Sequence, residues 1–214
     1  ELAKELIDIA AEAGADAVKF QSFVSENVIS KYAEKAQYQL ETTDPNETQL
    51  EMVKKYEFNL EQHYLLLDYC KKKKIEFLST PFDLTSADWL VRELDIPRIK
   101  ISSGDLTNAP LLLKVSQSGK QVLLSTGMST LGEIEMALSV LAFGYTKKYE
   151  SPSLEAFYNA YISQEGQEAL AKNVVLLHCT TEYPTPYTDV NLRALETLNK
   201  AFHLPVGFSD HTLG

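Results

Sequence analysis

Residues 75–126 read IEFLSTPFDLTSADWLVRELDIPRIKISSGDLTNAPLLLKVSQSGKQVLLST. Three short apolar runs begin in this stretch at residues 75, 98 and 121, each 23 residues after the one before. Thr85, followed by Asp88 three residues later, indicates a helix start between two of the runs. Strands that alternate with helices at this spacing form a parallel sheet with right-handed crossovers. The stretch therefore predicts an α/β fold.

Three further runs of the same kind extend this pattern, at residues 17–21, 174–180 and 205–209. Two more helix starts lie between the runs, where Asn59 precedes Gln62 and Thr130 precedes Glu133. The two long gaps, about 22–58 and 145–172, are interpreted as insertions, the second as an extra helical excursion. We expect all of residues 1–214 to belong to one domain.

Two architectures fit six strands that alternate with helices: an open doubly wound sheet and a (β/α)8 TIM barrel. No glycine-rich phosphate loop follows any of the runs, which favours the barrel over an open dinucleotide-binding sheet. A complete barrel has eight strands. We therefore expect an incomplete barrel with strands 2–7 in this chain, the first strand before residue 1 and the eighth after residue 214.

The composition excludes several classes of function. The net charge is −10 and the pI is about 4.9, which disfavours a nucleic-acid partner. No run approaches the roughly 18 apolar residues that a membrane span needs. The two cysteines, Cys70 and Cys179, have no metal-binding or redox spacing and are interpreted as reduced thiols of a cytoplasmic protein.

Polar side chains gather where the predicted strands end, which in a barrel is the mouth that carries the active site. Lys19 and Lys100 are the most informative, because each lies alone among apolar strand residues and lysine is rarely buried without a partner. Two such cations favour a ligand with phosphate or carboxylate groups. The alternative is that each lysine extends its ammonium into solvent.

The histidines differ in what their surroundings indicate. His211 follows the last strand and is a candidate metal ligand, acid–base group or simple hydrogen-bonding residue. His178 lies within an apolar run and is interpreted as a core histidine, whereas His63 and His203 are expected at the surface. Tyr183 lies in a proline-stiffened loop directly after a strand and is a candidate binding residue.

Six short motifs occur in one order along the chain: VKFQ (18–21), STPF (79–82), KISSG (100–104), STGM (125–128), HCTTEYP (178–184) and GFSDHT (207–212). Together they closely resemble the sialic acid synthase family, which includes legionaminic and pseudaminic acid synthases. The resemblance covers nearly all of the chain outside residues 145–172. It implies condensation of phosphoenolpyruvate with an N-acetylated amino sugar to give a nonulosonic acid and phosphate.

The resemblance also implies roles for individual residues. Asp105, which stands where relatives often carry Glu, and Lys100 would be catalytic, and His211 would bind a divalent metal, Mn²⁺ or Mg²⁺. Thr181 stands where sialic acid synthases tend to have Asn, and with Glu182 it is more similar to the legionaminic type. The phosphoenolpyruvate site would comprise Lys19, Lys100, Ser103, Ser125, Thr181 and Ser209, and the sugar site Gln21, Tyr183 and Asp210.

Further expectations follow from the family resemblance. A second metal histidine and a small C-terminal antifreeze-like domain would lie outside residues 1–214, and the whole protein would be a homodimer. The chain alone would then be inactive or nearly so. Three alternatives stay open: another phosphoenolpyruvate-dependent keto-deoxy sugar acid synthase, a Schiff-base aldolase that uses Lys19 or Lys100, and a non-catalytic barrel that binds an anion.

Overall fold

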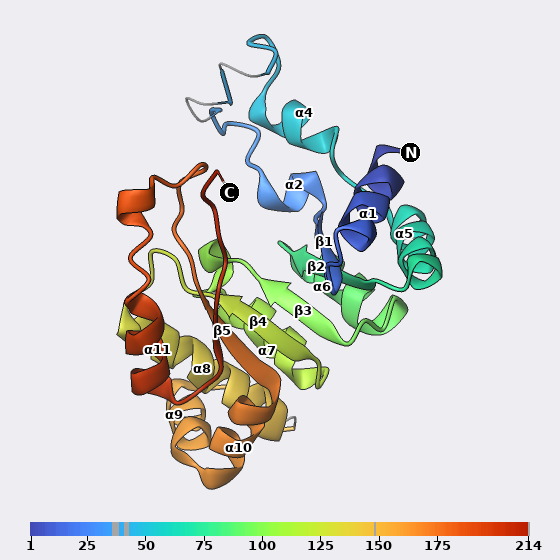
Figure 1. Ribbon diagram of the computed structural model, residues 1–214. Helices are drawn as coiled ribbons and strands as arrows, with labels where there is room; N and C mark the ends of the chain where they lie inside the picture. Colours follow the sequence, from blue (N-terminus) through green and yellow to red (C-terminus); the bar gives the residue numbers. More distant parts are fainter. Residues whose placement is uncertain (36–38, 41–42, 148, 214) are drawn as a thin grey trace. The chain divides into compact units, whose positions relative to one another are not determined.

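All six predicted strands form in the computed structural model, which describes residues 1–35, 39–40, 43–147 and 149–213 (Figure 1). Every strand pair is parallel, which confirms the α/β prediction. The strands are β1 (Ala17–Ser22), β2 (Glu76–Pro81), β3 (Arg98–Ile101), β4 (Gln121–Ser125), β5 (Val174–His178) and β6 (Val206–Phe208).

The described strands form two parallel sheets, each within its own compact unit of the chain. Residues 1–95 contain the pair β1-β2, and residues 96–214 contain the sheet β3-β4-β5-β6. Strands that are consecutive in sequence are neighbours in each sheet, as expected where a helix returns the chain for the next parallel strand. Closure of the strands into a barrel and a single domain over residues 1–214 stay predictions.

In the first unit, α1 (Leu2–Glu12) and α5 (Leu60–Lys73) pack together, and each also contacts the β1-β2 pair (Figure 1). Helix α5 begins with the predicted capping box, in which Asn59 and Gln62 each bind the other's backbone amide. The start predicted at Thr85 is wrong. The carboxylate of Asp83 caps α6 (Leu84–Asp88) instead, because it accepts hydrogen bonds from the first backbone amides of that helix, and a π-helical turn, η1 (Trp89–Glu93), follows.

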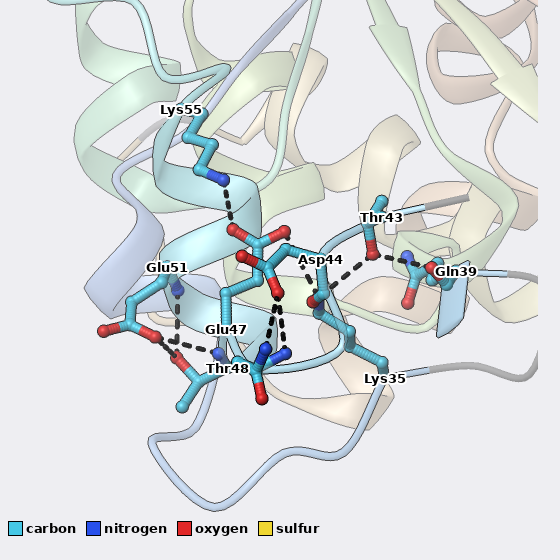
Figure 2. Close-up of polar contacts among 9 residues, drawn as sticks. Lys35, Gln39, Thr43, Asp44, Glu47, Thr48, Glu51 and Lys55 are labelled. Atoms are coloured by element: carbon cyan, nitrogen blue, oxygen red, sulfur yellow. Dashed lines mark hydrogen bonds and ion pairs between the residues drawn. The ribbon is translucent and has the colours of Figure 1, made fainter. Parts of the chain in front are cut away.

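The first predicted insertion contains two short helices, α2 (Ser25–Val28) and α4 (Gln49–Lys54), although its residues 36–38 and 41–42 lie outside the described part of the chain. Figure 2 shows the polar contacts that organise it. The Nζ of Lys35 donates to Thr43 Oγ1 at 3.0 Å and to the Asp44 carbonyl at 2.6 Å, and it forms an ion pair with Glu47 at 3.2 Å. The Lys35 side chain is only 3% exposed, so the insertion has a polar core of its own.

In the second unit, α7 (Ala109–Gln117) and α8 (Leu131–Thr146) pack against each other, and α11 (Ala194–Phe202) packs on β5 and β6. Two short 3₁₀ turns, η2 (Ser103–Asp105) and η3 (Tyr187–Asp189), follow β3 and β5. The second predicted insertion is helical, as expected. Apart from residue 148, which is not described, it forms α9 (Leu154–Ile162) and α10 (Gln164–Asn173), and both pack on α8 (Figure 1).

Two glycines of α8 give a matched test of the α7–α8 packing. A Cβ at Gly144 would lie 1.8 Å from Ser116 Oγ, whereas a Cβ at Gly132 would meet no atom within 4 Å. We expect Gly144→Ala to destabilise the protein by about 1–3 kcal/mol through overpacking. Gly132→Ala is expected to stabilise it by about 0.5 kcal/mol, because alanine loses less backbone entropy. Urea unfolding measures both changes, and equal effects at the two positions would contradict the packing.

Neither cysteine is in a disulfide. Cys70 and Cys179 are both buried, as predicted, and burial raises the pKa of the Cys70 thiol to about 11. Among the described helices, none has both the length and the apolar character that a bilayer span requires.

Candidate active site

Lys100 and Ser125 meet at the carboxyl ends of β3 and β4. The Lys100 residue is 7% exposed, and its Nζ donates to Ser125 Oγ at 2.6 Å and to the Ile101 carbonyl at 2.8 Å. An ammonium group is buried this deeply only where polar groups surround it. A direct hydrogen bond therefore supports the prediction that the Lys100 and Ser125 side chains lie together at the strand ends.

The loops after β3, β4 and β5 approach each other closely at Gly127. A Cβ at Gly127 would lie 2.8 Å from Cys179 Sγ and 3.4 Å from Ser103 Oγ. The next contact along the same edge joins Thr126 to β5, because its amide donates to the Leu177 carbonyl at 2.9 Å. Ser103 thus lies at the same edge of the sheet as Ser125, as predicted.

Asp105 is a half-buried carboxyl group in η2. Burial raises its pKa, and the side-chain amide of Asn108, which donates to Asp105 Oδ1 at 3.3 Å, partly offsets this effect. Asn108 also caps α7 by accepting from the Leu111 amide. The helix cap therefore holds this candidate acid–base group in place, and the raised pKa of Asp105 suits proton transfer.

Because the pKa of Asp105 is raised, its ionised carboxylate is expected to lower the free energy of unfolding. Its folded-state pKa lies above the unfolded value near 3.8, so the cost is absent at pH values below 3.8 and grows as the pH rises through the folded pKa. Asp105→Asn should therefore raise the urea midpoint at pH 7 and have a smaller effect near pH 4. A lower midpoint at pH 7 would contradict the desolvation of this carboxylate.

Tyr183 and His211 stack on each other in the loops after β5 and β6. Their ring centroids are 4.1 Å apart, and the Tyr183 hydroxyl lies 3.2 Å from His211 Nε2. Ser209 Oγ lies 3.3 Å from the same nitrogen, and the Thr185 amide donates to the His211 carbonyl at 2.8 Å. Three of the predicted residues, Ser209, Tyr183 and His211, are thus brought together.

The other two predicted residues of these loops are exposed. Thr181 follows β5 with an exposed side chain. The carboxylate of Asp210 accepts from the Thr212 amide at 2.9 Å, and this hydrogen bond holds its pKa below the ordinary value. Asp210 is therefore ionised at neutral pH.

His211 could supply one nitrogen ligand to a metal ion. Its Nδ1 is buried and has no hydrogen-bond partner, which leaves one nitrogen lone pair or N–H without a partner. Among the residues that the structure describes, no group of three or more His, Cys, Asp or Glu side chains is arranged to hold a metal ion. A metal at His211 would need its other ligands from beyond these residues.

Lys19 and Gln21 belong to the first unit, where both lie on β1 with exposed side chains. The chain around Lys19 nevertheless removes enough water from its ammonium to lower its pKa. Among the described residues no carboxylate forms an ion pair with Lys19, and loss of water around the ammonium is the cause of its lowered pKa.

Sequence patterns missed two residues that organise these loops. Asn108 holds Asp105, and its position just before a Pro-containing helix start was an available signal. Thr185 is buried and joins the loops after β5 and β6 through the hydrogen bond from its amide to the His211 carbonyl.

The other histidines differ in how well their burial was predicted. His63, expected at the surface, is fully buried, whereas His203 is exposed as predicted. His178 is half-buried, and its Nε2 donates to the Val190 carbonyl at 2.7 Å, so it is satisfied as predicted.

A cavity of about 410 Å³ lies beside the site, between the first turns of α8 and α11. Its walls include Met128, Ile134, Arg193 and Leu198, and none of the predicted site residues lines it. It also reaches Gly127 and Cys179 in the loops after β4 and β5, so it adjoins the site predicted at the strand ends.

Parallel strands that carry a buried lysine, hydroxyl groups and a desolvated carboxyl group at their carboxyl ends define an α/β protein with a candidate anion site. The chain belongs to the NeuB family, whose model matches residues 6–214. This confirms the resemblance to sialic acid synthases.

The relatives agree with this assignment. The chain is 49% identical to the N,N'-diacetyllegionaminic acid synthase of Campylobacter jejuni and 42% identical to that of Legionella pneumophila, and it is fully covered in both comparisons. It spans 57% and 54% of those two proteins, so it corresponds to about half of their length.

A solved structure supports the fold over the whole chain. The N-acetylneuraminic acid synthetase of Leptospira borgpetersenii, crystallised with citrate, matches with a TM-score of 0.73 and 32% identity, covering 100% of this chain and 60% of that one. A truncated 3-deoxy-D-arabino-heptulosonate 7-phosphate synthase from Thermotoga maritima matches with a TM-score of 0.55 at 15% identity, and shows likeness of fold alone.

Proposed function

We propose that the whole protein is an enzyme that condenses phosphoenolpyruvate with a 2,4-diacetamido-trideoxyhexose to form a legionaminic-type nonulosonic acid. The observation that carries the proposal is the hydrogen bond from buried Lys100 to Ser125, with Ser103 at the same edge of the sheet, at the strand ends of a NeuB-family chain. An ammonium and two hydroxyls suit a ligand with phosphate and carboxylate groups. The names of the Campylobacter jejuni and Legionella pneumophila relatives favour the diacetamido sugar over N-acetylmannosamine.

In the proposed reaction, C3 of phosphoenolpyruvate forms a bond to the aldehyde carbon of the open-chain sugar. Water adds to C2, and phosphate leaves with cleavage of the C2–O bond, which gives the 2-keto acid. Lys100, together with Lys19, would neutralise the ligand's phosphate and carboxylate. The hydroxyls of Ser103, Ser125, Thr181 and Ser209 would donate to the same anion.

Asp105 would accept the proton of the attacking water. Its raised pKa lies closer to neutral pH than that of an ordinary aspartate, which suits a general base. The sugar would contact Gln21, Tyr183 and Asp210. A divalent Mn²⁺ or Mg²⁺ bound at His211 would polarise the aldehyde oxygen as a Lewis acid. We further propose that the strands are part of a (β/α)8 barrel and that the whole protein is a homodimer, as the family resemblance implies.

A Schiff-base aldolase is the second candidate, and the lowered pKa of Lys19 favours it, since a neutral amine is the nucleophile in such enzymes. Borohydride reduction in the presence of the keto acid distinguishes the two. A covalent adduct on Lys19 would support the aldolase, and its absence together with phosphate release would support the condensation.

Phosphate release from phosphoenolpyruvate tests the proposed function. The whole protein is assayed with Mn²⁺ and one of three acceptors: the 2,4-diacetamido-trideoxyhexose, N-acetylmannosamine, or a phosphorylated aldose without an acetamido group. We expect turnover with the first acceptor. Turnover with the phosphorylated aldose alone would instead show a keto-deoxy sugar acid synthase, and phosphate release with none of them would contradict the proposal.

A further inference from the structure

A fully buried histidine to which the proposed reaction assigns no role connects α5 to the β1-β2 pair. His63 Nδ1 lies 2.8 Å from the Asn59 carbonyl, and Nε2 lies 2.7 Å from Ser22 Oγ. Ser22 Oγ in turn lies 2.7 Å from Ser79 Oγ. His63, Ser22 and Ser79 each have 0% exposure, so water cannot replace any of these contacts.

The chemistry of the partners fixes the direction of every hydrogen bond in this chain of groups. A carbonyl only accepts, so His63 Nδ1 must carry the proton and donate to Asn59. Nε2 then holds a lone pair and accepts from the Ser22 hydroxyl. Since Ser22 has donated its only proton, its oxygen accepts from Ser79.

The surroundings of His63 favour this neutral form. The rings of Phe58, Phe77 and Trp89 lie around the imidazole, with centroids 6.0–6.5 Å away. Burial among them lowers the pKa of His63. The neutral imidazole with its proton on Nδ1 satisfies each of the four groups in the chain.

The hydrogen bonds act on the last residue of β1. Ser22 directly follows Gln21 and lies three residues after Lys19, and successive strand residues point to opposite faces. Because Ser22 points towards α5, Gln21 and Lys19 are held on the opposite face. The next residues are also anchored, since the Val24 amide donates to Asp83 at 2.9 Å.

We propose that His63, through Ser22, is a positioning residue that fixes the carboxyl end of β1 and thereby the direction in which Lys19 and Gln21 point. The part of this inference that concerns a ligand rests on the proposed function. The part that concerns Lys19 itself does not, and can be measured without substrate.

Four variants separate positioning from simple stability. Ser22→Ala removes the hydroxyl at little change in volume, and His63→Leu removes the acceptor. His63→Gln retains an acceptor for the Ser22 hydroxyl in its amide oxygen. Ser116→Ala is the matched control, because Ser116 is equally buried but donates only within its own helix, to the Leu112 carbonyl.

The first measurement is an NMR titration of ¹³C-labelled lysines, with the Lys19 signal assigned by Lys19→Met. We expect the pKa of Lys19 to move in Ser22→Ala and in His63→Leu, to move less in His63→Gln, and to stay unchanged in Ser116→Ala. A Lys19 titration that is identical in Ser22→Ala and Ser116→Ala would overturn the proposal. So would ¹⁵N shifts that place the His63 proton on Nε2.

The second measurement is the steady-state kinetics of phosphate release. Ser22→Ala is expected to raise KM for phosphoenolpyruvate roughly 10-fold and to change kcat less, because a misplaced binding group weakens capture of the ligand. Unchanged KM in Ser22→Ala would contradict the inference. If the unsubstituted protein releases no phosphate, the proposed function fails while the Lys19 titration still decides whether His63 positions β1.

Discussion

Lys100→Met is expected to lower kcat/KM for phosphate release by about 10²- to 10³-fold, the size of effect found when a preorganised donor to a developing anion is removed. Lys100 is buried and bound to Ser125, so its ammonium is already oriented before a ligand arrives. Methionine has a similar length without the charge, which avoids leaving an empty cavity. The phosphate-release assay measures the loss.

Two further variants sharpen this result. Ser125→Ala should cost about 10-fold, since it removes one hydroxyl but keeps the cation. Lys172→Met, on the exposed surface of α10, removes the same charge from the chain and should leave the activity unchanged. An active Lys100→Met protein, or equal losses in the Lys100 and Lys172 variants, would show that Lys100 does not bind the reacting anion.

Removal of divalent metal is the second change with a large expected effect. Treatment with a chelator should abolish phosphate release, and added Mn²⁺ or Mg²⁺ should restore it. His211→Ala should raise the metal concentration needed for half-maximal activity by about 10- to 100-fold, through loss of a ligand with a free, buried nitrogen.

His203→Asn is the control for the histidine variant, because His203 is exposed and lies in a left-handed conformation that asparagine tolerates. Its metal dependence should equal that of the unsubstituted protein. Full activity after complete removal of metal, or an unchanged metal dependence in His211→Ala, would contradict the assignment of His211.

The strands and most helix starts could be predicted because their signals are local. The apolar runs at residues 98 and 121 became β3 and β4, and the capping boxes at Asn59 and Thr130 formed as expected. The start at Thr85 was misplaced by two residues, because the charged carboxylate of Asp83 accepts from the Thr85 and Ser86 amides and so begins the helix earlier.

The candidate site could be predicted in its residue types but not in all of its contacts. Lys100 and Ser125 were grouped because both end parallel strands, and the grouping needs no knowledge of side-chain direction. His63 was placed at the surface because a histidine on a polar helix carries no local sign of burial. Its partner Ser22 lies 41 positions from it and 57 positions from Ser79, and only tertiary packing brings the three side chains together.

A crystal structure of the whole protein with phosphoenolpyruvate bound tests the central claim most directly. The account predicts that Lys100 Nζ and Ser125 Oγ lie at hydrogen-bonding distance, about 2.7–3.2 Å, from the ligand's phosphate or carboxylate oxygens. It also predicts that Lys19 Nζ contacts the same molecule. Phosphoenolpyruvate bound in the cavity between α8 and α11, or held without either lysine, would contradict it.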